Sequence, residues 1–342
     1  MTDLPATDWA ETIPEGEAAE LEALAEELIA VQRARAAKRG SISRALHAKG
    51  HGGARATFTV NADLPEHLRQ GVFATPGHTY EALVRFSNGS GAHDKDATGD
   101  VRGIAIKLLA VEGDKIIPGL EKATTQDFLL IQGQTPPFGT AREFVALVVA
   151  ASGSPLLLLP RFASRVGWGR AFGVVRALLA SINAPFVTFA GKRLFSALPF
   201  AYGPYAVKAA ILPAGEIDSA GRGRGPDQLA DDLAARLADG PLEWDFAVQL
   251  FVDEAKTPIE DASHEWKESD APFHRVARLT VPQQDVRSDE GRALTERIEE
   301  MSFDPWHALP AHRPLGNMMR ARSAAYRLST MERKASPEPG IG

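Results

Sequence analysis

The residues best suited to chemistry are a histidine near the start of the chain and a tyrosine near its end. His47 stands just ahead of a glycine-rich turn and a strand-like segment, in HAKGHGGARATFTV. Tyr326 follows Arg322 by four residues on a predicted helix, so both side chains lie on one helix face. An imidazole can exchange protons near neutral pH, and a guanidinium within contact favours the ionised form of a phenol. Each residue alone also suits a plain packing role.

Two segments further along carry charged and polar side chains at strand spacing. In VRFSNGSG, Arg85 and Ser87 are two residues apart and therefore share one face of a strand. A serine on that face can hold an imidazole in one tautomer, and a buried arginine needs an anionic partner. In DVRGIAIKLL, Asp100 and Arg102 flank the start of the next strand, where a salt bridge in a turn is the simplest interpretation.

Strand-like and helix-like segments follow one another in a pattern typical of a β-rich core that is interrupted and finished by helices. Residues 16–38 show helical spacing of apolar side chains and end at Gly40, which suits a helix C-cap. Two helical segments, EGRALTERIEEM and PLGNMMRARSAAYRLSTMERK, end the chain. Strands are predicted over residues 54–60, 82–87, 103–109, 127–132, 205–213, 242–253 and 275–282.

Composition excludes several classes of protein. The 342 residues are 44% hydrophobic and 24% charged, as expected of a soluble globular chain with a core. The absence of cysteine rules out disulfides and thiolate ligands, so any iron must be held by Tyr, His or Met. A formal net charge of -6 argues against nucleic acid and against an anionic membrane as partners.

Neither the start of the chain nor its most apolar stretch resembles an export signal or a membrane span. The acidic start MTDLPATDWAETIPEGE has no positive region followed by an apolar one, so we expect a cytoplasmic protein. Residues 156–189 are apolar, but Pro160 and four arginines interrupt them. We therefore expect no stable membrane insertion.

The motifs, taken together and in their order, resemble the catalase family. HAKG, VRFS and D-x-RG-x-A-x-K match the opening barrel strands of that family, and R-x-x-x-Y matches the helix that closes its haem pocket. The chain is similar to the short branch of catalase-like proteins. The resemblance implies an α+β fold, with an antiparallel β-barrel core, surrounding helices, and haem b between the barrel face and the last helix. The resemblance covers residues 40–334 and implies a haem-binding domain there. Outside it, the residue pattern predicts a helical arm over residues 1–39 and a disordered tail over 335–342.

The resemblance also implies a role for each motif residue. Tyr326 would ligate the haem iron as a phenolate, stabilised by the charge of Arg322. His47 would be the acid/base that moves the proton of a bound peroxide, and Ser87 would hydrogen-bond to it. The remaining residues expected at the haem, as partners of its propionates or edge and as an aromatic ring over its distal face, are Arg44, Arg85, Arg333 and Phe138.

One departure from the family pattern shapes the predicted activity. Ordinary catalases carry an asparagine shortly before the strand that here reads DFLLI, whereas this chain has Thr125 at or near that position. Because that asparagine helps to place the second hydrogen peroxide, we expect a peroxidase that reduces hydrogen peroxide or organic hydroperoxides, oxidises small organic donors and has weak catalase activity. Two alternatives stay open. One is an isomerase or lyase of fatty-acid hydroperoxides, with the apolar block as an access route, and the other is a haem-binding protein with little turnover.

Three further features complete the expectations. The amino-terminal helix carries an apolar stripe that predicts a subunit contact, and hence a homodimer, through Leu21, Leu24, Leu28 and Ile29. The stretch PIEDASHEW suits a surface turn and a helix start better than a metal site, since its spacing matches no known site. The two histidines of the proline-rich connector before the last helix are expected to be structural; they are His307 and His312.

Overall fold

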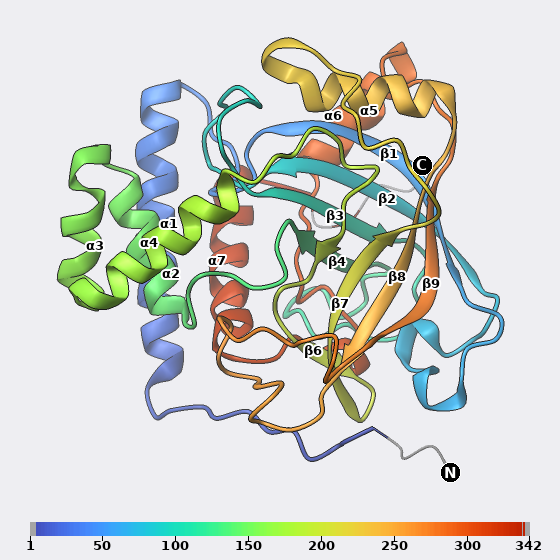
Figure 1. Cartoon of the computed structure of the whole chain (residues 1–342), viewed down its shortest axis with the longest axis horizontal. Coiled ribbons are helices and arrows are strands. Elements are labelled where there is room, and N and C mark those ends of the chain that lie inside the picture. Colours follow the sequence, from blue (N-terminus) through green and yellow to red (C-terminus); the bar gives the residue numbers. More distant parts are fainter. Residues whose placement is uncertain (1–4, 337, 339–342) are drawn as a thin grey trace.

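Eight antiparallel strands close into a barrel in the computed structural model, which describes residues 5–336 and 338 (Figure 1). The sheet order is β5-β4-β3-β2-β1-β9-β8-β7-β6, and β5 pairs with both β4 and β7, which closes the barrel and leaves β6 as a short extension. The strands are β1 Gly50–Val60, β2 Thr79–Asn88, β3 Arg102–Leu108, β4 Gln126–Ile131, β5 Leu194–Phe195, β6 Phe200–Tyr202, β7 Tyr205–Pro213, β8 Leu242–Leu250 and β9 Phe273–Val281. Each predicted strand corresponds to one of these, and the expected α+β barrel is confirmed.

Seven α-helices of the described residues cover the outside of the barrel. In Figure 1, α7 lies between α1 and the barrel, α5 and α6 cross one end of the sheet, and α2 to α4 form a separate lobe beside α1. The helices are α1 Glu17–Arg39, α2 Ala141–Ala151, α3 Leu158–Val166, α4 Trp168–Ile182, α5 Gln228–Asp239, α6 Asp289–Glu300 and α7 Asn317–Arg333. None of these helices combines the length and the hydropathy that a membrane span requires.

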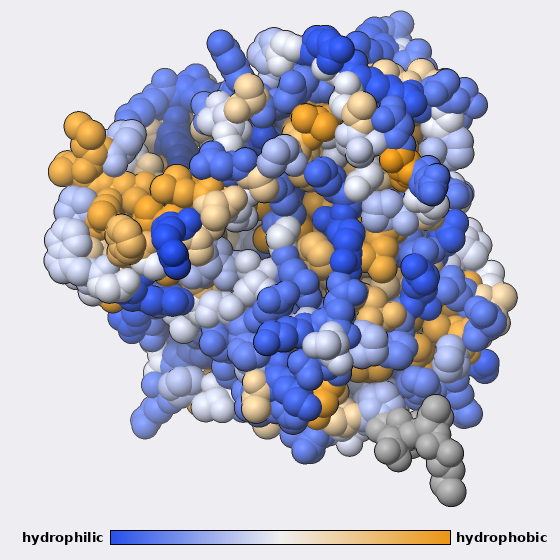
Figure 2. Space-filling view, viewed as in Figure 1, coloured by the Kyte–Doolittle hydropathy of each residue, from blue (hydrophilic) through white to orange (hydrophobic). Residues whose placement is uncertain are grey.

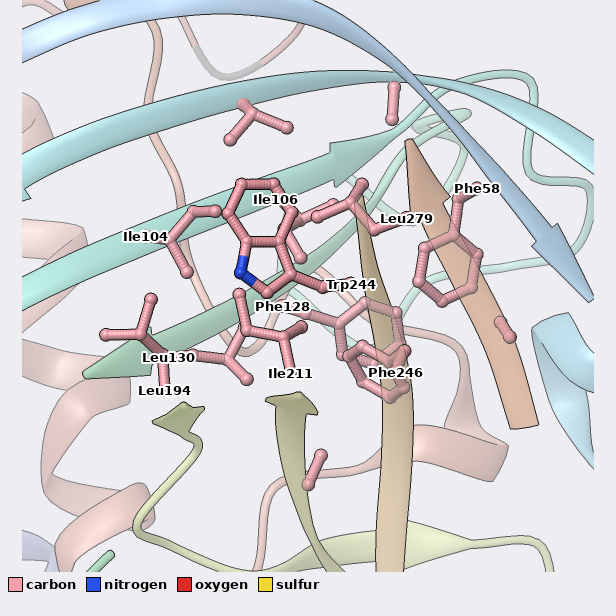
Figure 3. Packing of buried hydrophobic residues seen from close by; sticks show 14 of the residues in the cluster. Phe58, Ile104, Ile106, Phe128, Leu130, Leu194, Ile211, Trp244, Phe246 and Leu279 are labelled. Atoms are coloured by element: carbon pink, nitrogen blue, oxygen red, sulfur yellow. The ribbon is translucent and has the colours of Figure 1, made fainter. Parts of the chain in front are cut away.

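The inside of the barrel is a packed hydrophobic core. Alternation along the strands turns Val84 and Phe86 of β2 inward, into the same cluster as Phe128 and Phe246. The rings of Phe128 and Phe246 lie close together there (Figure 3). A cavity lined by Phe128, Phe246 and His312 has a volume of only about 20 Å³, room for little more than one water. Because packed side chains fill the barrel, side chains that bind a large ligand are expected on its outer face.

The amino-terminal helix packs against the rest of the same chain. It begins and ends close to the predicted limits, and Gly40 takes the left-handed conformation of a C-cap, with φ of 78°. Leu21, Leu24 and Leu28 are buried in one cluster with Met318 and Met319 of α7. The apolar stripe that was expected to contact another subunit is thus covered by the same chain. It no longer supports the predicted homodimer.

The segment expected to be a disordered tail, residues 335–342, makes contacts where it is described. The backbone N–H of Ser302 donates to Ser336 O at 2.8 Å, and Glu338 Oε1 lies 2.7 Å from His307 Nε2. Residues 337 and 339–342 lie outside the described residues. The described part of this segment therefore extends the packed domain beyond Arg333.

A fully buried ion pair lies on the outer face of the sheet. Lys107 Nζ of β3 and Asp127 Oδ1 of β4 are 2.7 Å apart, and both side chains are 0% exposed. Asp127 Oδ2 also accepts the backbone N–H of Asp304 at 2.8 Å, which ties the segment after α6 to the sheet. Neither charge has access to water, so each depends on the other for compensation.

We expect Lys107→Met to destabilise the fold by roughly 3–5 kcal/mol, because it leaves the Asp127 carboxylate buried without its partner. The free energy of unfolding from a urea titration measures this. Lys122→Met is the matched control, since Lys122 and its partner Asp114 are 83% and 67% exposed, and it is expected to change stability by less than about 0.5 kcal/mol. Equal effects of the two substitutions would contradict the prediction.

Candidate functional site

The first element of the site is an imidazole held against the outer face of β2 and β3. His47 adopts a left-handed backbone conformation with φ of 54°, and its N–H donates to Gly89 O at 2.9 Å. Its Nδ1 lies 3.0 Å from Ser87 Oγ. A Cβ on Gly103 of β3 would stand 2.7 Å from His47 Cε1, so the absence of a side chain at this position makes room for the ring. The contact expected between His47 and Ser87 is present.

Burial, together with the positive charges nearby, keeps the His47 ring neutral. Burial lowers the pKa of His47 to about 3, and the positive charges of Arg85 and Arg322 add to this effect. Above roughly pH 4 the imidazole therefore has a free lone pair and can accept a proton.

The second element is a cluster of arginines around one carboxylate. Arg85 Nε donates to Glu299 Oε1 at 2.8 Å, and Arg44 Nη1 donates to Glu299 Oε2 at 2.5 Å. Arg333 of α7 donates to the backbone carbonyls of Glu299 and Met301 at 3.4 and 3.2 Å. The three arginines expected to act together thus come together, from the segment before β1, from β2 and from α7.

The arginine cluster carries more positive than negative charge. Burial, and then the like charge of Arg85, lower the pKa of Arg44 to about 9 and that of Arg333 to about 10. Burial alone would raise the pKa of Glu299, but Arg85 and Arg44 outweigh it and hold that pKa below its usual value. Three guanidinium groups against one carboxylate favour the binding of a further anion.

The third element is the tyrosine of α7. Arg322 Nη2 donates to Tyr326 Oη at 2.7 Å, and the guanidinium lies 5.1 Å from the centre of the tyrosine ring. The phenol oxygen thus accepts a charge-assisted hydrogen bond. Further along α7, Arg333 donates to Met301 O, the same carbonyl that accepts from Arg44 Nη2 at 2.8 Å, so α7 lies beside the arginine cluster of the sheet.

Two predicted site residues have other partners. Thr125 directly precedes β4, whose first residue, Gln126, pairs with Leu108 at the end of β3. His47 instead lies against Gly103, near the start of β3. Thr125 and His47 are therefore at opposite ends of this strand. The Thr125 hydroxyl is 3.1 Å from His307 Nε2, and no contact joins it to His47.

Phe138 packs beside α2, with its ring 5.0 Å from that of Phe144. The structure therefore places the Thr125 hydroxyl away from the imidazole, whereas Phe138 also packs in the cluster that includes Met318 and Met319 of α7. The role predicted for Phe138 at the haem stays a prediction. His307 and His312 are buried and hydrogen-bonded, as a structural role requires; the backbone N–H of Val72 donates to His312 Nε2 at 3.0 Å.

Sequence reasoning missed Glu299 and Gly103. A buried arginine on β2 signals the need for an anion, but the carboxylate that meets it lies 214 residues further along the chain. Gly103 lies in the D-x-RG motif, but its role is to leave room for the His47 ring, and that role depends on where the ring lies in the fold. Neither role follows from local spacing.

Comparisons with known proteins agree with this architecture. A family model described as Catalase matches residues 12–117. The chain is 29% identical over 305 residues to a catalase-related peroxidase of Mycolicibacterium paratuberculosis, a match that covers 84% of this chain and 87% of that protein. It is 39% identical over 72 residues to a catalase-like protein of Staphylococcus aureus, which covers 21% of this chain and 16% of that one.

Solved catalases share the fold. A fungal catalase superposes with a TM-score of 0.68 at 19% identity, covering 85% of this chain and 59% of the other. A bacterial catalase gives 0.66 at 18% identity, covering 92% and 61%. The chain thus spans about three fifths of the length of these catalases.

The closed barrel, the imidazole on its outer face and the facing helix with its arginine and tyrosine define a barrel protein of the catalase type. The partial family match, the peroxidase relative and the shared fold together support a member of the catalase superfamily. The relatives support an oxidoreductase with activity of the peroxidase or catalase kind.

The catalase family implies a haem, and the residues of this chain fit one. Haem propionates are two carboxylates, and the cluster of Arg44, Arg85 and Arg333 has two positive charges in excess over Glu299. Arg333 Nε is buried and has no hydrogen-bond partner in the described part of the chain, so it has a donor to offer. Tyr326, paired with Arg322, has the chemistry of an anionic oxygen ligand for ferric iron.

Proposed function

We propose that this protein is a haem b peroxidase that reduces hydrogen peroxide or organic hydroperoxides, oxidises small organic donors and releases little oxygen. The observation that carries the proposal is the pairing of a neutral, serine-bound imidazole on the sheet with a guanidinium-bound phenol on the facing helix. A cytoplasmic location and a homodimeric state remain predictions.

The cofactor would be held from two sides by residues of this chain. Tyr326 would be the iron ligand, and Arg322 would donate the 2.7 Å hydrogen bond to its oxygen. Arg44, Arg85 and Arg333 would bind the propionates. When bound, the haem supplies the iron redox chemistry that cleaves an oxygen–oxygen bond.

The proton chemistry would be the work of His47. With Nδ1–H donating to Ser87 Oγ, the ring keeps its lone pair on Nε2, which can accept the proton of a hydroperoxide. The same nitrogen can then return that proton to the leaving oxygen. Ser87 acts as a positioning residue, because it holds the ring in one orientation and one tautomer.

The test is an absorption spectrum followed by product analysis. The purified chain, supplied with haem b, is expected to show a high-spin ferric spectrum with a phenolate charge-transfer band. With hydrogen peroxide and a phenolic donor, donor oxidation is expected to exceed oxygen release. A chain that stays colourless after haem addition would overturn the proposal, and rearrangement of a fatty-acid hydroperoxide without donor oxidation would instead support the isomerase or lyase alternative.

A further inference from the structure

The lobe formed by residues 155–182 exposes large apolar side chains. Among the described residues, ten large hydrophobic side chains are exposed, and five of them belong to this short segment. Figure 2 shows hydrophobic surface gathered over α3 and α4. The five are Leu156, Leu157, Trp168, Phe172 and Leu179, with exposures that range from 45% to 89%.

Three of these side chains share one face of α4. Trp168, Phe172 and Leu179 are four and seven residues apart, so they project from one side of the helix. Ala171 and Val174, on another side, are buried against Phe162 and the rest of the lobe. α4 therefore has one apolar side that packs in the lobe and a second apolar side, formed by Trp168, Phe172 and Leu179, that is exposed. No part of the described chain covers this second side.

The charge of this lobe is opposite in sign to that of the whole chain. Residues 155–182 contain four arginines and no acidic residue, although the chain has a formal net charge of -6. Arg165 pairs with Glu27, and Arg170 pairs with Glu143. Arg161 and Arg176 are exposed and form no ion pair with any described residue. The net charge that argued against an anionic membrane therefore conceals a local cationic surface.

We propose that α3 and α4 dock this protein on the surface of an anionic lipid bilayer. Tryptophan, phenylalanine and leucine on one helix face are the side chains that enter the headgroup region, and nearby arginines pair with lipid phosphates. The 15 residues of α4 are too few to cross the hydrocarbon, so the helix lies in the plane of the surface. A second copy of the chain is the less favourable occupant, because a self-complementary contact would place arginines against arginines.

The test is flotation of the full chain with vesicles of two compositions. We expect binding to vesicles of equal parts phosphatidylcholine and phosphatidylglycerol, and at least about tenfold weaker binding to phosphatidylcholine alone. Raising the salt concentration should weaken the first interaction. No binding to the phosphatidylglycerol vesicles would overturn the proposal.

Two double variants locate the contact. Trp168→Ser with Phe172→Ser, and separately Arg161→Gln with Arg176→Gln, are each expected to weaken vesicle binding at least about tenfold. All four side chains are exposed, so the fold should persist, which the thermal midpoint checks. Val252→Ser with Met331→Ser removes exposed apolar side chains outside the lobe and should leave binding unchanged.

Two outcomes would contradict the proposed contact. The first is binding by the lobe variants that equals that of the unaltered chain. The second is a dimer in solution that the Trp168 and Phe172 substitutions convert to a monomer, which would assign the surface to a second copy. Neither result depends on haem content or peroxide turnover, so this proposal stands or fails separately from the proposed function.

Discussion

Replacing Tyr326 by phenylalanine is expected to abolish the phenolate charge-transfer band and to lower peroxidase turnover by a factor of about a hundred or more. The substitution removes the oxygen that accepts the hydrogen bond from Arg322, while the ring remains. Without the phenolate, the bound haem loses its anionic ligand from this helix. The spectrum of the haem-loaded protein and a steady-state assay with hydrogen peroxide and a phenolic donor measure both effects.

Tyr80→Phe is the matched control for this substitution. Tyr80 is also partly buried, and its hydroxyl donates one hydrogen bond, to Val72 O at 3.1 Å. Loss of that hydroxyl is expected to cost about 1 kcal/mol of stability and to leave the spectrum unchanged. If Tyr326→Phe kept the band and the turnover of the unaltered chain, Tyr326 would not be the iron ligand.

Replacing His47 by glutamine is expected to lower the rate of peroxide reduction between a hundredfold and ten-thousandfold, roughly the range attributed to a positioned acid/base group. Glutamine is similar in length and can still hydrogen-bond to Ser87, but it cannot take up and return a proton. Haem binding is expected to be unaffected, because the residues expected to hold the cofactor are the tyrosine and the arginines. A haem titration and a single-turnover peroxide assay separate the two properties.

The pH dependence gives a second measurement of the same residue. Since burial and the neighbouring arginines hold the pKa of His47 near 3, acidification from about pH 8 to about pH 5 leaves the ring neutral and should cause no loss of rate through this group. His78→Gln, at an exposed histidine, is the control and should behave as the unaltered chain. A rate that falls with an apparent pKa near 6.5 and loses this dependence in His47→Gln would contradict the assigned environment.

Local spacing determined a large part of the candidate site. Arg85 and Ser87 share a strand face, and Arg322 and Tyr326 share a helix face, because the geometry of each element sets which side chains are neighbours. The helix limits around Gly40 and most of the strands followed from the same periodicities. These are properties of short segments, which the sequence displays directly.

Contacts between distant segments were decided only by the tertiary structure. Arg44 and Arg85 meet Glu299, which lies 255 and 214 residues away, and the stripe of α1 is covered by α7 from the other end of the chain. The Thr125 hydroxyl contacts His307 and not the imidazole of His47. The apolar spacing of α4 suits a core helix, but one of its apolar faces is exposed in the structure. Which surfaces pack against each other depends on how the helices are arranged around the closed barrel. That arrangement involves the whole chain, and no single segment of the sequence contains it.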